Sequence, residues 1–247
     1  MIKLNKIVKF FGRLRALDGV DLELRKGEVT GLIGPNGSGK TTLVNIMTGI
    51  YAADSGEVLI KGKDHSRSSA ESIAGLGVAR TFQNIRIFKK MTVLENVIAA
   101  LLAGKKWGAA KLLSSAMSVK DPELGKACEA LETLGLQVKQ KLLAEDLPLP
   151  LLRRLEIARA LARDPEMILL DEPAGGMTPS ETAELADLIS QRVAPGRTCV
   201  VIEHKMDLIS EICSHLVVLH HGEKIAEGEP GPVLGLSRVV EAYLGKA

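Results

Sequence analysis

The sequence predicts an α/β fold in which strands alternate with helices, so that most strands run parallel in one sheet. Three short apolar runs support this class: Val29–Ile33, which is rich in β-branched residues, Met167–Leu170 and Thr198–Ile202. A segment of helical character follows each run. Between the first run and the other two, residues of about 84–163 have mostly helical patterns. We therefore expect a parallel-sheet core with a helical part inserted into it.

The core and the insertion are expected to form one domain over residues 1–247. Residues 1–83 and 164–247 would form the α/β core, and about 84–163 the helical subdomain. Near the N-terminus, Val20–Leu24 alternates strictly between apolar and polar residues, which is typical of a strand with one face in water. We expect this region to form an antiparallel β part beside the parallel sheet.

Local patterns predict the elements that follow. Val58–Ile60 is a predicted strand, residues 65–72 form a polar surface segment, and Gly77–Phe82 is a strand that leads to Gln83. Thr92-Val93-Leu94-Glu95 has the pattern of a capping box, so a helix should begin there.

The rest of the helical region contains two further predicted helices. Asp121 and Pro122 are expected to begin one, as cap and first-turn proline. Leu147–Pro150 is predicted to be a proline-interrupted loop, and Arg153–Ala162 the helix that follows it.

The α/β pattern then resumes to the end of the chain. A capping box at Thr178–Glu181 predicts a helix that continues to about Arg192. Asp207–Cys213 is a further predicted helix, and Leu216–Leu219 and Lys224–Ala226 are expected to form a terminal hairpin.

Composition excludes several classes of protein. The net charge of +2 gives no case for a nucleic-acid partner. The longest apolar run, Val97–Ala103, is far shorter than the ~20 residues that cross a bilayer, and residues 1–12 carry interspersed lysines without a secretion-signal pattern. Cys128, Cys199 and Cys213 form no C-x-x-C pair, so we expect reduced thiols and no zinc site.

Residues 34–41 have the pattern G-x-x-x-x-G-K-T of a phosphate-binding loop, and they lie between a predicted strand and a predicted helix. Backbone N–H groups at a helix N-terminus bind phosphate, and glycines let the backbone approach it closely. Lys40 would reach the β- and γ-phosphates, and the Thr41 hydroxyl would bind Mg²⁺. The predicted nucleotide-binding residues of this loop are Gly34, Pro35, Asn36, Gly37, Ser38, Gly39, Lys40, Thr41 and Thr42.

Two acids follow the apolar run Met167–Leu170, at the edge where α/β sheets bind ligands. Asp171 is predicted to hold Mg²⁺. Glu172 could polarise a water for attack on the γ-phosphate, and such a general base contributes about 10²–10⁴ in rate.

With the phosphate loop, the segment Leu169–Pro173 resembles the ATPase subunit of ATP-binding cassette (ABC) transporters, and the resemblance covers nearly the whole chain. It implies a P-loop nucleoside triphosphatase core that hydrolyses ATP with Mg²⁺. It also implies that Gln83 senses Mg²⁺ and the γ-phosphate, that His204 contacts the γ-phosphate, and that Phe11 stacks on adenine. The expected partners are separate membrane permease subunits, at the cytoplasmic face of the inner membrane.

Four segments are similar, more narrowly, to the branched-chain amino acid importers: Arg80–Phe88, Met91–Val97, Arg154–Ala160 and Ala242–Gly245. A helical stretch near Ala99–Val119 is similar to the larger of the two ATPase subunits in those systems. The resemblance implies import of branched-chain or related amino acids, with a periplasmic binding protein as an indirect partner.

The chain departs from the family pattern at its signature, usually L-S-G-G-Q, where it has Leu147-Pro148-Leu149-Pro150-Leu151. The usual serine and glycines bind the γ-phosphate held by the opposing subunit, whereas prolines have no N–H to donate. Thr178 also stands where an Asn or Asp is usual. We therefore expect a heterodimer with a second ATPase that has an intact signature.

Two alternatives remain at this point. The chain could be a nucleotide-dependent regulatory subunit with weak hydrolysis. It could also be a GTPase switch, since His204-Lys205-Met206-Asp207 faintly resembles the guanine-reading N-K-x-D, but the Asn is missing.

Overall fold

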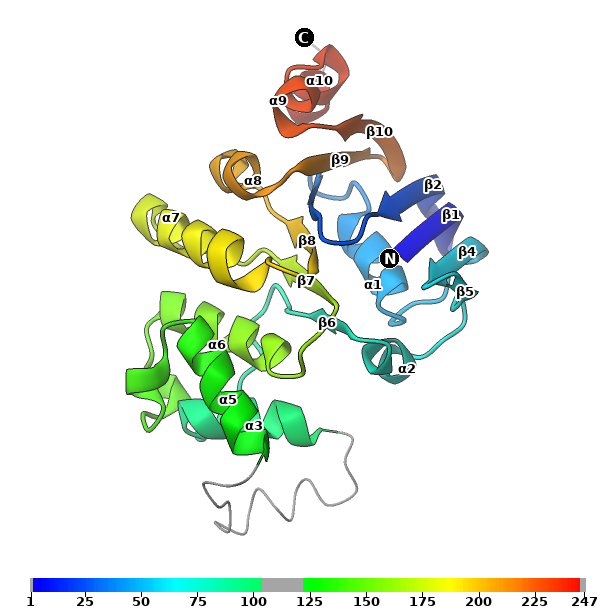
Figure 1. The fold of residues 1–247 in the computed structure, drawn as a ribbon. Helices are drawn as coiled ribbons and strands as arrows, with labels where there is room; N and C mark the ends of the chain where they lie inside the picture. Colours follow the sequence, from blue (N-terminus) through cyan, green and yellow to red (C-terminus); the bar gives the residue numbers. More distant parts are fainter. Residues whose placement is uncertain (1, 104–121, 245–247) are drawn as a thin grey trace.

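The computed structural model describes residues 2–103 and 122–244. Two sheets and a set of helices make up this part of the chain (Figure 1). The strands are β1 (Ile2–Phe11), β2 (Leu14–Leu24), β3 (Val29–Ile33), β4 (Ser55–Ile60), β5 (Lys63–Asp64), β6 (Val78–Arg80), β7 (Met167–Asp171), β8 (Thr198–Ile202), β9 (His215–His220) and β10 (Glu223–Gly228). The helices are α1 (Lys40–Met47), α2 (Ala70–Gly75), α3 (Val93–Leu102), α5 (Pro122–Thr133), α6 (Leu149–Leu161), α7 (Pro179–Leu188), α8 (Met206–Ile212), α9 (Pro230–Leu234) and α10 (Ser237–Leu244).

The larger sheet has the strand order β10-β9-β3-β8-β7-β6. The five strands from β9 to β6 in this order pair in parallel, and only the edge strand β10 is antiparallel to its neighbour. The carboxyl ends of β3, β7 and β8 therefore meet at one edge, with Asp171 paired to Ile202. The predicted α/β class with a mostly parallel sheet is confirmed.

The smaller sheet is antiparallel, in the order β2-β1-β4-β5, and confirms the predicted N-terminal β part. Helix α1 lies between the two sheets, because its apolar residues share one hydrophobic cluster with both. Leu4 and Val20 contribute from the small sheet, and Leu169 and Val200 from the large one. This packing fixes the helix that begins at the glycine-rich loop.

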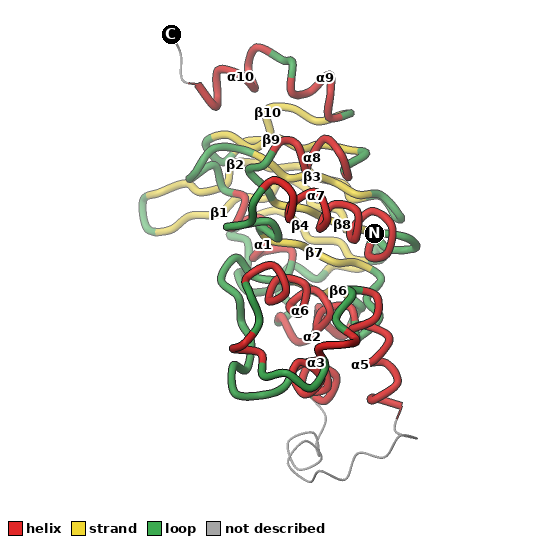
Figure 2. Tube along the Cα trace, turned by 90° about the vertical axis from the view of Figure 1, so that its left-hand side faces the viewer, coloured by secondary structure: helices red, strands yellow, loops and turns green. Residues whose placement is uncertain are grey.

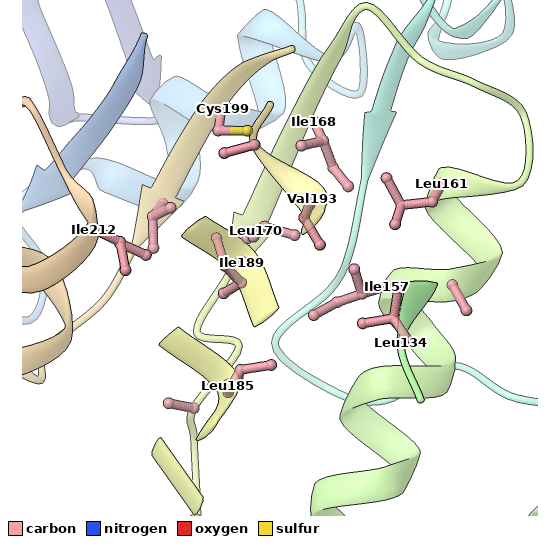
Figure 3. Packing of buried hydrophobic residues seen from close by; sticks show 14 of the residues in the cluster. Leu134, Ile157, Leu161, Ile168, Leu170, Leu185, Ile189, Val193, Cys199 and Ile212 are labelled. Carbon is pink, nitrogen blue, oxygen red and sulfur yellow. The ribbon is translucent and has the colours of Figure 1, made fainter. Parts of the chain in front are cut away.

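The two faces of the large sheet pack into different clusters, as expected for strands buried on both sides. On β7, Leu169 faces the α1 side, whereas Ile168 and Leu170 pack towards α7 and α6. Figure 3 shows this second cluster, in which Leu185 of α7 and Ile157 of α6 lie near the strands. Helices α3, α5 and α6 gather below the edge strand β6 in Figures 1 and 2, so the predicted helical insertion lies at one end of the sheet.

Three of the predicted segments differ in the structure. Helix α6 begins at Leu149 rather than near Arg153, with Pro148 as N-cap and Pro150 in the first turn. A proline is tolerated there, because N–H groups in the first turn make no hydrogen bond within the helix and none is lost. A short helix, α2, interrupts the expected polar surface segment at residues 65–72, with the Ser69 hydroxyl as its cap. The helix that begins at Thr178 ends in a π-helical turn over Ile189–Val193.

Some predictions lie outside the described residues: the Asp121 cap, most of the helical stretch near Ala99–Val119, and Gly245. Within residues 2–103 and 122–244, no helix is long and apolar enough to cross a membrane.

Candidate active site

The glycine-rich loop joins β3 to α1 in a conformation that requires its glycines. Gly34, Gly37 and Gly39 have φ values of 152°, 78° and 103°. A Cβ on Gly34 would lie 2.1 Å from the Leu219 carbonyl oxygen, and one on Gly39 would lie 2.8 Å from that of Ala16. The loop is therefore held tightly against its neighbours, and α1 begins directly after it at Lys40. Its amide donors and the positive end of the helix dipole favour an anion.

Lys40 is buried and bends back over this loop. Its Nζ donates to the carbonyl oxygens of Gly34, at 2.7 Å, and Pro35, at 3.0 Å. Burial lowers the pKa of Lys40, while the nearby carboxylates of Glu172 and Asp171 oppose that shift. The ammonium thus lies between the loop and the two acids, where a phosphate would bind.

Glu172 is held between two side chains from neighbouring strand ends. The amide of Gln83 donates to its Oε2 at 3.0 Å, and Nε2 of His204 lies 3.2 Å from its Oε1. Its backbone lies in the left-handed region, with φ 48°, which is uncommon for a residue with a side chain, and its N–H donates to Ile202 at 2.9 Å. Three residues that the sequence predicted separately therefore meet at one point.

Asp171 is buried and paired with Arg80. Nη2 of Arg80 lies 2.7 Å from Oδ2 of Asp171, and the two side chains are 8% and 6% exposed. The Asp171 N–H also donates to the Thr81 hydroxyl at 3.1 Å. Sequence reasoning gave Arg80 no role. The sequence did carry a sign of it, which is a cation within an otherwise apolar strand. A charge buried in such a strand needs a partner of opposite charge.

Phe11 lies at the end of β1 with its side chain half-exposed, and so does Phe10. The Phe11 ring forms an edge-on pair with Tyr51 at 5.5 Å between centroids, and Nζ of Lys9 lies 5.7 Å from the ring centre. An exposed aromatic face beside a cation is suited to a nucleobase. The other predicted contacts differ in exposure: Asn36 and Thr41 are exposed, whereas Thr42 is partly buried.

The family model described as ABC transporter matches residues 17–175. The chain belongs to this family. ATP hydrolysis is the family's general activity, so the chain is an ABC ATPase, and the resemblance seen in its motifs is confirmed.

Three relatives of this ABC ATPase show how far the likeness extends. The high-affinity branched-chain amino acid transport ATP-binding protein LivG of Escherichia coli (strain K12) is 38% identical over 100% of this chain and 98% of its own. A crystal structure of the ADP conformation of an ATP-binding cassette has a TM-score of 0.88 at 36% identity, covering 100% of this chain and 99% of that one. A dimeric bacterial ABC transporter cassette has a TM-score of 0.77 at 27% identity, covering 93% and 99%.

The residues at this edge fit the ATP that the ABC ATPase uses. Lys40 and the loop amides are donors for phosphate oxygens. Ser38 supplies a further polar group, since its buried Oγ makes no hydrogen bond within the part of the chain that the structure describes. Thr41, Gln83 and Asp171 carry oxygen ligands of the kind that Mg²⁺ prefers.

Glu203 joins the loops on either side of the Glu172 site, a role that the sequence did not reveal. Its buried carboxylate accepts hydrogen bonds from three backbone N–H groups: Ala174 at 2.8 Å, His204 at 2.9 Å and Lys205 at 3.3 Å. Nζ of Lys205 in turn donates to Met177 O at 2.7 Å. The loop after Glu172 and the loop that carries His204 are therefore fastened together.

Tyr243 of the last helix reaches the phosphate loop of this ABC ATPase. Its hydroxyl lies near the Gly34 backbone. Partial burial raises the pKa of Tyr243 to about 12, although the Gly34 backbone opposes the shift. Helix α10 therefore lies against the phosphate loop, although Tyr243 and Gly34 are 209 residues apart in the sequence.

Proposed function

We propose that this ABC ATPase binds Mg²⁺ and ATP and drives the import of branched-chain or related amino acids. It would act as a peripheral subunit at the cytoplasmic face of the inner membrane, with separate permease subunits, a second ATPase and, indirectly, a periplasmic binding protein. The printed name of the Escherichia coli relative supports the substrate class. No nucleic-acid partner is part of the proposal.

The observation that carries the hydrolytic role is the position of Glu172 between Gln83 and His204. Both carboxylate oxygens are held, so the group has a fixed direction when it accepts a proton from water. Lys40 and the loop amides would hold the β- and γ-phosphates in place. Mg²⁺, bound through Thr41, Gln83 and Asp171, would neutralise charge on the phosphate oxygens.

The permease is proposed to dock in a cleft of about 550 Å³ between the sheet edge and the helical part. Apolar residues of α2, α3 and α6 line it, together with Phe82 and the basic side chains of Arg86 and Arg159. Helix α6 also holds the segment that leads to the active site, because Arg153 donates to Gln83 O at 2.9 Å and Glu156 accepts from the Phe82 N–H at 3.2 Å. A permease segment in this cleft would therefore act on Gln83 through Phe82 and helix α6.

The start of α6 supports a heterodimer. Pro148 is its N-cap without a side-chain cap hydrogen bond, and Leu151 and Leu152 turn their N–H groups back to the Pro148 oxygen at 3.0 and 3.1 Å. Neither proline supplies an N–H, and each lost hydrogen bond to a charged group costs about 1.5–3 kcal/mol. A partner with its own serine and glycines would complete the site that holds this chain's ATP.

Replacing Glu172 by Gln in the assembled transporter tests the proposal. We expect ATP turnover and amino-acid uptake to fall by about 10²–10⁴. The matched control is Glu166→Gln, an exposed acid at the opposite end of β7. Unchanged turnover would instead favour the alternative of a regulatory subunit. Native mass spectrometry tests the assembly, since two copies of this chain without a second ATPase would contradict the heterodimer.

A further inference from the structure

Arg80 makes more buried contacts than its place on a short edge strand requires. Besides its 2.7 Å bond to Asp171, its Nη1 donates to Oδ1 of Asn45 at 2.5 Å and approaches the Thr48 hydroxyl at 3.4 Å. Asn45 lies on α1, the helix that begins at the phosphate loop, and Thr48 is its C-cap. One guanidinium thus joins the loop's helix to the predicted metal ligand.

The guanidinium is also fixed from another side. Its central carbon lies 5.1 Å from the centre of the Phe82 ring, within reach of a cation–π interaction. The planar group with its separate N–H donors can bond Asn45 and Asp171 in different directions at once, which a lysine ammonium at this site would do poorly. Arg80 therefore has little freedom to rotate, and neither has the carboxylate that it holds.

This arrangement leaves Asp171 with one free oxygen. Oδ2 is taken by Arg80, and Oδ1 makes no hydrogen bond to any of the residues that the structure describes. The direction of Oδ1 follows from how Arg80 holds its partner. Ligating carboxylates are commonly oriented in this way by hydrogen bonds from outside the metal site, and losing such a partner typically costs 10–100-fold in metal affinity or activity.

We propose that Arg80 is a positioning residue that orients the Asp171 carboxylate for the metal ion bound with ATP. The inference rests on the proposed role of Asp171 as a metal ligand. Without Arg80, the buried Asp171 carboxylate loses its ion-pair partner and turns towards Lys40, the nearby ammonium that already interacts with it electrostatically. The carboxylate is then drawn away from the position that the metal ion needs, while Lys40 stays bonded to the loop carbonyls of Gly34 and Pro35.

The test measures binding rather than turnover. A fluorescent ATP analogue is titrated into the isolated full chain in excess EDTA and again at increasing Mg²⁺. For Arg80→Gln we expect the Mg²⁺ concentration at half-maximal effect to rise by about tenfold or more, while the affinity in EDTA stays within about twofold. Arg80→Lys should lie between this variant and the wild type, because it keeps the charge but loses the two-way hydrogen bonding. Arg197→Gln, which breaks an ion pair with Asp164 on the surface, is the control and should match the wild type.

Asp171→Asn separates this inference from the proposed function. If it leaves the Mg²⁺ dependence unchanged, the metal-ligand role of Asp171 is wrong. If it shifts that dependence while Arg80→Gln does not, or if Arg80→Gln binds Mg²⁺ more tightly, the positioning role of Arg80 is overturned. Should Arg80→Gln fail to fold, Arg80→Lys decides the matter, and a wild-type Mg²⁺ dependence in that variant overturns the proposal.

Discussion

Glu203 offers the sharpest test of how the two loops around Glu172 are held. The change Glu203→Gln keeps the shape of the side chain but replaces one acceptor oxygen by an NH₂ donor. The new NH₂ must then face either the N–H of Ala174 or the two N–H groups of His204 and Lys205, which are donors as well. Glu203 is 2% exposed, so water cannot replace the lost acceptor.

The cost follows from the lost bonds. A hydrogen bond to a charged group contributes about 1.5–3 kcal/mol, and an unsatisfied buried donor costs a similar amount. We therefore expect the free energy of unfolding to fall by about 3 kcal/mol, equivalent to about 6–12 °C in Tm for a chain of this size. ATP turnover should fall by up to about 10²-fold, because both segments that flank Glu172 lose an anchor.

Thermal denaturation and steady-state ATPase measurements on the assembled transporter check these values. Glu211→Gln is the control, since Glu211 is exposed on α8 and should change neither quantity. A Tm of Glu203→Gln within about 2 °C of the wild type, with normal turnover, would refute the idea that Glu203 fastens the loops.

Three further outcomes are expected. Lys40→Ala should weaken ATP binding by about 10–100-fold in a fluorescence titration, because it removes a charged donor to phosphate, and undiminished affinity would count against the phosphate loop. Tyr243→Phe removes the hydroxyl that meets Gly34. Burial raises the pKa of Tyr243 from 10.0 to about 12, so the stability that this group contributes is present below pH 10 and is lost between pH 10 and 12. Denaturant unfolding measured across this pH range should therefore show a smaller loss of stability in the variant than in the wild type. The double change Pro148→Ser and Pro150→Gly introduces a hydroxyl and an amide at the start of α6, so ATP turnover by the proposed heterodimer should rise. No rise would indicate that the partner's ATP site does not use these two groups.

The sequence predicted the chemistry of the strand ends because those groups are specified by short motifs. Gly34–Thr41 requires a tight turn before a helix, and Asp171 and Glu172 follow a run that is apolar enough to be buried on both faces. Parallel pairing then brings such ends together, which is why Gln83 and His204 lie beside Glu172.

The sequence could not reveal contacts that only the tertiary fold creates. Arg80 and Asp171 are 91 residues apart, and nothing local marks them as partners. Glu203 precedes a residue with an evident role and looks like a solvated acid until the fold buries it against Ala174. The start of α6 was mispredicted because proline usually signals a loop, yet Pro150 is tolerated in a first turn.

The measurement that tests the central claim most directly separates ATP binding from cleavage in one variant. In the assembled transporter, Glu172→Gln should bind ATP at least as tightly as the wild type, because a negative charge beside the phosphates is removed, while single-turnover cleavage falls by about 10²–10⁴. Cleavage at the wild-type rate, or an equal loss of binding and cleavage, would contradict the role of Glu172 as the base that directs water at the phosphate held by Lys40.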